Sequence, residues 1–290
     1  MIDMKEIVVI SGKGGTGKTS IVGSFAAIAQ SKVLADCDVD AADLHLLLSP
    51  SIIKEQEFRG GYTAEINEQL CSQCGLCEEL CRFNAIHDLT VDPISCEGCG
   101  FCSYACPEEA ITMNECLSGH WYISETRYGP LVHARLGIGE ENSGKLVALV
   151  RQNARQLAEK ESFEYIITDG PPGIGCPVIS SLSGATMALL VTEPTLSGIH
   201  DLERVIGVCR HFGVPSFVCV NKYDINEDNT LSIEKFCSDQ GIDVLSKIPL
   251  DHVVTEALVN GLPVVEYSRN GVSREIERLW AKIHGILDRQ

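Results

Sequence analysis

Residues 11–19 read Ser11-Gly12-Lys13-Gly14-Gly15-Thr16-Gly17-Lys18-Thr19 and lie between the apolar run Ile7-Val8-Val9-Ile10 and a helical pattern that extends to about Ser31. A glycine-rich loop between a strand and a helix is typical of a phosphate-binding loop. Glycine lets successive backbone amides point inward, and the helix start adds the positive end of its dipole. We therefore predict a nucleotide site, with Lys18 on the β- and γ-phosphates and Thr19 on Mg²⁺. The predicted cradle comprises Gly12, Lys13, Gly14, Gly15, Thr16, Gly17, Lys18, Thr19 and Ser20.

A second lysine, Lys13, lies inside the same loop. With it, the loop resembles that of the deviant Walker A ATPases, which include MinD, ParA, the nitrogenase iron protein and the Mrp-type iron-sulfur carriers. In that group the extra lysine crosses a dimer interface to the nucleotide of the other subunit. The resemblance implies that the chain forms a homodimer on binding ATP and that Lys13 acts in trans. The alternative is that Lys13 is a solvated loop charge.

The composition limits the class of protein. The chain has 290 residues, enough for one large α/β domain and a small extra module. It has no apolar run that could span a membrane and no secretion-type N-terminus, so we expect a cytoplasmic protein without stable membrane insertion. Its 14 cysteines then favour metal clusters or redox chemistry over disulfides. A net charge of -17 would repel a phosphate backbone, which argues against a nucleic-acid partner.

An acidic segment follows the second expected strand, Lys32–Ala35. It reads Asp36-Cys37-Asp38-Val39-Asp40 and precedes a leucine-rich helical pattern. Carboxylates at the carboxyl end of a parallel strand lie beside the ligand crevice. In the resembled ATPases the second aspartate of an Asp-x-Asp motif orients the attacking water, which implies this role for Asp38. Asp36 and Asp43 are weaker candidates, and the acidic run also fits a simple helix N-cap.

Two matching quartets of cysteines appear where the α/β pattern ends, from about Phe58. They read Cys71-x2-Cys74-x2-Cys77-x3-Cys81 and Cys96-x2-Cys99-x2-Cys102-x3-Cys106-Pro107. This is the spacing of a bacterial-type ferredoxin with two clusters, in which the fourth cysteine of each quartet binds the other cluster. A pair of zinc sites is the alternative. The predicted [4Fe-4S] ligand sets are Cys71, Cys74, Cys77 and Cys106 for one cluster, and Cys96, Cys99, Cys102 and Cys81 for the other.

The first quartet departs from the ferredoxin pattern at one position. Cys81 is followed by Arg82 rather than by proline, which changes the charge near one cluster but removes no ligand. Cys116, beyond the second quartet, is interpreted as a spare thiol. We expect a module of this size to depend on its clusters for folding.

A third element of the nucleotide site follows the expected strand that begins at Phe163. Asp169 ends this strand and is followed by Gly170-Pro171-Pro172-Gly173, close to the switch II motif of the MinD-like group. A carboxylate there contacts Mg²⁺, usually through water, while the next loop senses the γ-phosphate. Cys176 is interpreted as a partly buried structural cysteine, with coupling to redox or cluster chemistry as the alternative. The segment 137–145 is expected to be a loop that approaches the nucleotide or the other subunit.

The remaining expected strands cover 187–192, 216–220 and 243–248, and their apolar character fits a sheet covered on both faces. In the resembled group an asparagine after the second of them contacts adenine, and an Ile-Pro segment after the third packs on the base. The implied base contacts are Asn221, Lys222, Asp224 and Pro249. Because Asn-Lys-x-Asp is also the guanine-reading pattern of GTPases, GTP is the alternative to ATP. The amphipathic pattern 276–287 is expected to pack on the sheet, with a membrane anchor as the alternative.

The matches extend over nearly the whole chain and imply an α/β fold. We expect a doubly wound, mostly parallel sheet of the P-loop NTPase, MinD/ParA-like kind with an inserted bacterial-ferredoxin-like α+β module. The expected ATPase domain covers residues 1–57 and 123–290, and the module covers 58–122.

Our leading hypothesis is an ATPase in which nucleotide-driven dimerisation is coupled to electron transfer through two [4Fe-4S] clusters. Its predicted catalytic residues are Lys13, Lys18, Asp38 and Asp169, and its partner is an unidentified redox or iron-sulfur acceptor protein. One alternative is an iron-sulfur carrier or scaffold for metalloprotein assembly. The other is a spatial organiser of the MinD/ParA kind.

Overall fold

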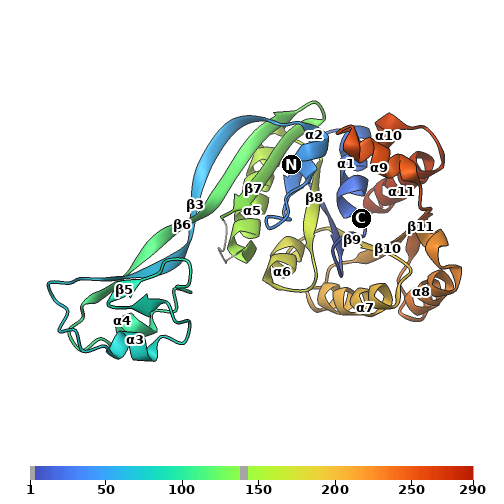
Figure 1. Cartoon of the computed structure of the whole chain (residues 1–290). Coiled ribbons are helices and arrows are strands. Elements are labelled where there is room, and N and C mark those ends of the chain that lie inside the picture. The colour runs from blue at the N-terminus through green and yellow to red at the C-terminus, as the bar shows by residue number, and fades with distance from the viewer. Residues whose placement is uncertain (1–3, 138–142, 290) are drawn as a thin grey trace. The chain divides into compact units, whose positions relative to one another are not determined.

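The computed structural model describes residues 4–137 and 143–289 (Figure 1). The chain divides into two compact units. The larger unit comprises Met1–Glu55, Trp121–Arg135 and Ser143–Gln290, and the smaller comprises Gln56–His120 and Leu136–Asn142.

A nine-stranded sheet organises the larger unit, in the order β11-β10-β9-β1-β8-β2-β7-β6-β3. Every pair from β11 to β7 is parallel. This confirms the expected α/β fold with a mostly parallel sheet. The strands are β1 (Lys5–Ser11), β2 (Lys32–Asp36), β3 (Ser51–Ile66), β6 (Ile111–Thr126), β7 (Gly129–Leu136), β8 (Tyr165–Pro172), β9 (Met187–Thr192), β10 (Ser216–Asn221) and β11 (Val244–Ile248).

Helices cover both faces of this sheet because successive strand side chains point to opposite sides. Ile7 and Val9 of β1 face α1 (Lys18–Ile28), α2 (Leu44–Leu48), α9 (His252–Val259), α10 (Val264–Tyr267) and α11 (Gly271–Leu287). Val8 and Ile10 face α6 (Cys176–Leu182), α7 (Leu196–His211) and α8 (Glu227–Asp239), which follows the short 3-10 helix η1 (Tyr223–Ile225). Helix α5 (Ser143–Glu161) contacts α6 and β2.

The C-terminal helix α11 packs on the sheet as expected. Its apolar side chains Ile276, Leu279 and Ile283 are buried, and the Trp280 ring lies 5.1 Å from the Phe25 ring. Within the ranges that the structure describes, no helix combines the length and apolarity that a membrane crossing requires.

Strand β3 and most of strand β6 were not predicted from the sequence. Each has 16 residues and includes residues of both units. The pattern break expected near Phe58 therefore falls inside β3 rather than at its end. Ile52 and Ile53 are more than half exposed, so this strand lacks the apolar alternation that marks a half-buried strand.

The smaller unit repeats its backbone with an offset of 25 residues. It contains α3 (Leu76–Leu80), the two-stranded pair β4 (Ile86–His87) and β5 (Thr90–Val91), and α4 (Phe101–Ala105). Gly75 and Gly100 precede the two helices with φ angles of 75° and 73°. The two halves also exchange backbone hydrogen bonds, because Asn67 N donates to Ala110 O and Asp92 N donates to Ala85 O.

Candidate nucleotide site and cysteine pockets

The glycine-rich loop follows β1 and ends where α1 begins. The chain runs from β1 through α1 to β2 on one side of the sheet, and from the neighbouring strand β8 through α6 to β9 on the other side, so the two connections leave in opposite directions. Ligands bind at such switch points in open α/β sheets. A cleft of about 650 Å³ lies here. Its lining includes Gly14, Gly15, Gly17, Lys18, Thr19, Ser20, Asp38, Asp40, Asp43, Leu46, Pro171, Pro172 and Leu258.

Lys18 begins α1 and is 5% exposed. The residue before it, Gly17, has a φ of 92°, which favours glycine. A Cβ at Gly17 would lie 2.4 Å from Asn221 Nδ2, which donates a hydrogen bond of 2.8 Å to Thr16 O. Asn221, the last residue of β10, therefore packs against the loop and anchors its backbone.

Two buried aspartates stand side by side at the carboxyl ends of adjacent strands, where Asp36 of β2 pairs in register with Asp169 of β8. Burial and the charge of Asp169 raise the pKa of Asp36 well above its ordinary value. The carboxylate of Asp36 accepts hydrogen bonds from the backbone amides of Asp38 and Leu44. Asp36 therefore fixes the backbone of the acidic loop through these hydrogen bonds, and it is not among the residues that line the cleft.

Asp169 has the properties of a metal-binding carboxylate. Burial raises its pKa to about 7, while Lys18 and a hydrogen bond from the Thr19 hydroxyl lower it. Its Oδ1 is buried without a hydrogen-bond partner among the described residues. A free carboxylate oxygen beside a hydroxyl is a donor set that suits Mg²⁺.

Asp38 lines the cleft together with two further carboxylates, Asp40 and Asp43. Burial raises the pKa of Asp38, the charge of Lys18 opposes this, and the two neighbouring acids raise it further. The cleft thus places an acid of raised proton affinity across from the lysine of the glycine-rich loop.

Glu193 is bound to two lysines, Lys13 of the glycine-rich loop and Lys222 after β10. Its Oε1 lies 2.6 Å from Lys13 Nζ, and its Oε2 lies 3.2 Å from Lys222 Nζ. Lys13 Nζ also donates to Thr195 Oγ1 and Ser197 Oγ, while Lys222 Nζ donates to Gly15 O. Both lysines lower the pKa of Glu193 against the effect of burial. Sequence reasoning missed Glu193, although an acid at the end of the strand next to β1 was a usable signal.

Three of the predicted base contacts make hydrogen bonds within the chain instead. Asn221 and Lys222 hold the glycine-rich loop, and Asp224 Oδ1 accepts a hydrogen bond of 2.7 Å from Leu250 N. Of the described residues, those that line the cleft do not include Pro249 or these three. Their role in reading the base stays a prediction.

The region beyond switch II is only partly described. Cys176 is exposed at the start of α6, and a Cβ at Gly144 would lie 3.1 Å from its Cβ. Of the glycine-rich segment expected to form a loop, residues 138–142 lie outside the described residues, and Ser143 begins α5. The expectation of a partly buried structural cysteine is therefore wrong for Cys176, whose side chain is exposed, and its coupling to redox chemistry stays a prediction.

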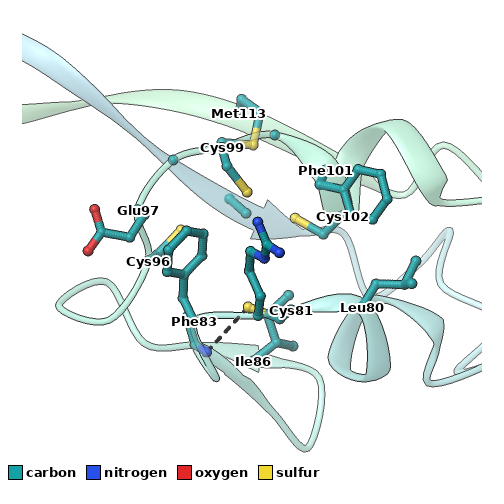
Figure 2. Close-up of a pocket in the computed structure, with 15 residues that line it drawn as sticks. Leu80, Cys81, Phe83, Ile86, Cys96, Glu97, Cys99, Phe101, Cys102 and Met113 are labelled. Carbon is teal, nitrogen blue, oxygen red and sulfur yellow. Dashed lines mark hydrogen bonds between the residues drawn. The ribbon is translucent and has the colours of Figure 1, made fainter.

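The eight cysteines of the two quartets line two separate pockets in the smaller unit. One pocket of about 550 Å³ is lined by Cys81, Cys96, Cys99 and Cys102 together with apolar side chains such as Ile86, Phe101 and Met113 (Figure 2). The other, of about 20 Å³, is lined by Cys71, Cys74, Cys77 and Cys106. The structure thus brings together the two sets that the spacing predicted, with Cys81 and Cys106 exchanged between the quartets.

Backbone amides donate to sulfur at matching positions of the repeat. Ala85 N donates to Cys81 Sγ and Ala110 N to Cys106 Sγ, each at 3.4 Å, and Gln73 N donates to Cys71 Sγ at the same distance. Cys116 Sγ lies 3.7 Å from Ser118 Oγ. Hydrogen bonds of this kind stabilise thiolates that bind metal clusters.

The described residues contain no group of three or more His, Cys, Asp or Glu side chains that could hold a single metal ion. In the described residues the cysteines thus do not converge on a common metal position, whether for zinc or for another ion.

The comparison with protein families covers most of the chain. Residues 7–264 match the model of the CobQ/CobB/MinD/ParA nucleotide-binding domain. The chain belongs to this family. It is therefore a P-loop ATPase of the MinD/ParA kind.

Relatives of this MinD/ParA-family ATPase match nearly its full length. An uncharacterized protein of Methanocaldococcus jannaschii is 34% identical over 281 residues, which are 96% of each chain. The septum site-determining protein MinD of Bacillus subtilis is 25% identical over 289 residues, 96% of this chain and 88% of its own.

Solved structures show the same fold. MinD of Pyrococcus horikoshii, in complex with Mg-ADP, superposes with a TM-score of 0.59 at 19% identity and covers 97% of this chain and 96% of its own. MinD of Pyrococcus furiosus superposes with a TM-score of 0.60 at 18% identity, and the match covers 97% of this chain and 99% of its own.

Proposed function

We propose that this ATPase binds Mg-ATP in the cleft and holds two [4Fe-4S] clusters in the smaller unit, and that ATP-driven pairing of two chains is coupled to electron transfer. The observation that carries the proposal is the crosswise sorting of the cysteines: Cys81 joins the second quartet and Cys106 joins the first. Exchange of the fourth ligand between two quartets is the arrangement of two-cluster ferredoxins.

The nucleotide half assigns roles to Lys18, Thr19 and Asp38, which line the cleft, and to Asp169 and Lys13, which are not among its lining residues. Lys18 binds the β- and γ-phosphates, and Thr19 with Asp169 holds Mg²⁺. Asp38 orients the attacking water, which its place among the lining residues supports. Lys13 completes the site of a second chain. We favour ATP over GTP, because the resemblance to the MinD-like group implies that an asparagine at this strand end, here Asn221, contacts adenine.

The cluster half rests on how well the cysteines fit the group. Each pocket gathers four thiols, its other side chains are largely apolar, and amides donate to sulfur in both. A bound [4Fe-4S] cluster supplies one-electron transfer. The protein's contribution is to position the thiols and to limit water around them.

The named relatives favour a second candidate function. They include septum site-determining proteins, so a spatial organiser of the MinD/ParA kind agrees with the family comparison better than electron transfer does. An iron-sulfur carrier is a third possibility that uses the same pockets. The organiser predicts nucleotide-dependent recruitment to a surface, and the carrier predicts ready loss of a cluster to an apo-acceptor protein.

The deciding experiment is anaerobic purification of the full chain, followed by iron and sulfide analysis and by EPR with and without MgATP. We expect two [4Fe-4S] clusters per chain and a cluster signal that changes when MgATP is added. The Lys18→Ala variant is the control, because it should keep both clusters and lose the response. Zinc or no metal at the eight cysteines would overturn the cluster half. Intact clusters without any response to MgATP would overturn the coupling.

A further inference from the structure

The two cysteine pockets differ in the residue that follows the exchanged cysteine. Arg82 follows Cys81 and lines the larger pocket, whereas Pro107 follows Cys106 and lines the smaller one together with Glu108. The backbone around these positions is otherwise alike. Asn84 and Glu109, each three residues after its cysteine, have φ angles of 54° and 49°, and Ala85 and Ala110 make the matching bonds to sulfur. The two halves of the repeat thus share their backbone geometry at these positions but differ in charge, with a cationic residue in the lining of the larger pocket and an acidic one in the lining of the smaller.

Figure 2 shows what surrounds the larger pocket. The thiols of Cys81, Cys99 and Cys102 point into a common space, and the dashed line marks the bond from Ala85 N to Cys81 Sγ. Glu97 also lines this pocket, but its carboxylate points away from the thiols. Phe83 and Phe101 add apolar surface around the space. Arg82 is therefore the one cationic side chain in the set of described residues that lines this pocket.

A positive charge beside a cluster favours its reduced form. Reduction adds one electron and no proton, so the cluster gains one negative charge that a nearby guanidinium stabilises. Arginine keeps its charge at every physiological pH, so the effect is permanent. We propose that Arg82 raises the reduction potential of the cluster held by Cys81, Cys96, Cys99 and Cys102, and leaves that of the other cluster unchanged. This inference rests on the proposed function, because it requires both clusters to bind.

The hydrogen bonds to sulfur do not account for such a difference. The bonds at Cys81 and Cys106 have the same length, and the further bond from Gln73 N acts on the smaller pocket. Burial by apolar side chains around the larger pocket works against reduction, because it disfavours added charge. The charge of Arg82 is therefore the feature that raises the reduction potential of the cluster in the larger pocket.

The test is potentiometry followed by EPR on the full-length protein after anaerobic reconstitution. Dithionite, a low-potential donor, supplies the electron for each cluster and is itself oxidised. Arg82→Gln removes the charge, and Arg82→Lys keeps it as the matched control. We expect Arg82→Gln to lower one midpoint, so that the ratio of reduced to oxidised cluster at fixed potential falls by about tenfold, or 59 mV for one electron. Arg82→Lys should retain most of the wild-type midpoint.

A second variant tests the assignment to one pocket. Glu108→Gln removes a negative charge from the lining of the smaller pocket. It should therefore raise the midpoint potential of the cluster in the smaller pocket and leave the midpoint potential of the cluster in the larger pocket unchanged. The iron and sulfide content of each variant must equal that of the wild type. The inference is overturned if Arg82→Gln moves neither midpoint, or moves both equally, in a protein that carries both clusters. Absence of clusters in the wild-type protein would instead reject the proposed function itself, and this inference with it.

Discussion

Lys13 Nζ and Glu193 Oε1 lie 2.6 Å apart within a single chain. The two side chains are 28% and 15% exposed, so the pair is partly shielded from water. Glu193 also binds Lys222, which in turn donates to Gly15 O of the glycine-rich loop. In the isolated chain Lys13 is thus held by the end of β9. If Lys13 acts on the nucleotide of a second chain, this ion pair must open first.

Replacing Glu193 by Gln should therefore strengthen ATP-dependent dimerisation. A partly exposed ion pair contributes on the order of 1 kcal/mol, which corresponds to about fivefold in the dimer dissociation constant. Sedimentation with a non-hydrolysable ATP analogue measures the change. Glu234→Gln is the control, because its pair with Lys247 lies elsewhere on the surface. A weaker or unchanged dimer would show that Glu193 does not restrain Lys13.

The two lysines of the loop should give different defects. Lys18→Ala should abolish nucleotide binding, because this buried side chain faces the cleft. Lys13→Ala should keep nucleotide binding by the single chain and lose dimerisation and turnover. Isothermal titration calorimetry and phosphate release separate the two effects. Unchanged ATPase activity in both variants would reject the model of the site.

Mg²⁺ binding should strengthen as pH rises from 6 to 8. The pKa of Asp169 is raised to about 7, so below this pH a proton occupies the carboxylate and competes with the metal. Above it the carboxylate is free, and the affinity for Mg²⁺ levels off. Asp169→Asn should bind Mg²⁺ more weakly and show little of this pH dependence. Mg²⁺ dependence of ADP binding, measured by calorimetry at each pH, checks the prediction, and a pH-independent affinity in the wild type would contradict it.

Glu6 should be a main determinant of stability in the larger unit. Its buried carboxylate pairs with Arg151 at 2.6 Å, and it also pairs with Arg155. Glu6→Ala leaves the Arg151 charge buried without its partner, which should lower the free energy of unfolding by about 3–5 kcal/mol. Glu234→Ala removes a partly exposed pair with Lys247 in the same unit and should cost about 1 kcal/mol or less. Denaturant midpoints compare the two, and equal losses would refute the assignment.

The amino-acid sequence determined those features whose signal is local. The apolar runs predicted the strands of the parallel sheet, since each strand is buried on both faces, and the glycines before Lys18 predicted the loop between β1 and α1. The spacing of the cysteines predicted which four would share a pocket, because a 25-residue repeat imposes the same backbone twice. Residues within one short segment decide each of these features.

Only the tertiary structure decided the contacts between distant segments. Glu193 forms an ion pair with Lys13, 180 positions earlier in the chain. Asp36 lies beside Asp169 on the adjacent strand, and Asn221 at the end of β10 donates a hydrogen bond to Thr16 O. The 16-residue strand β3 was also out of reach, because its exposed side chains leave no apolar period. Sheet order sets these partners. That order arises from how the whole core packs, and no single stretch of the chain encodes it.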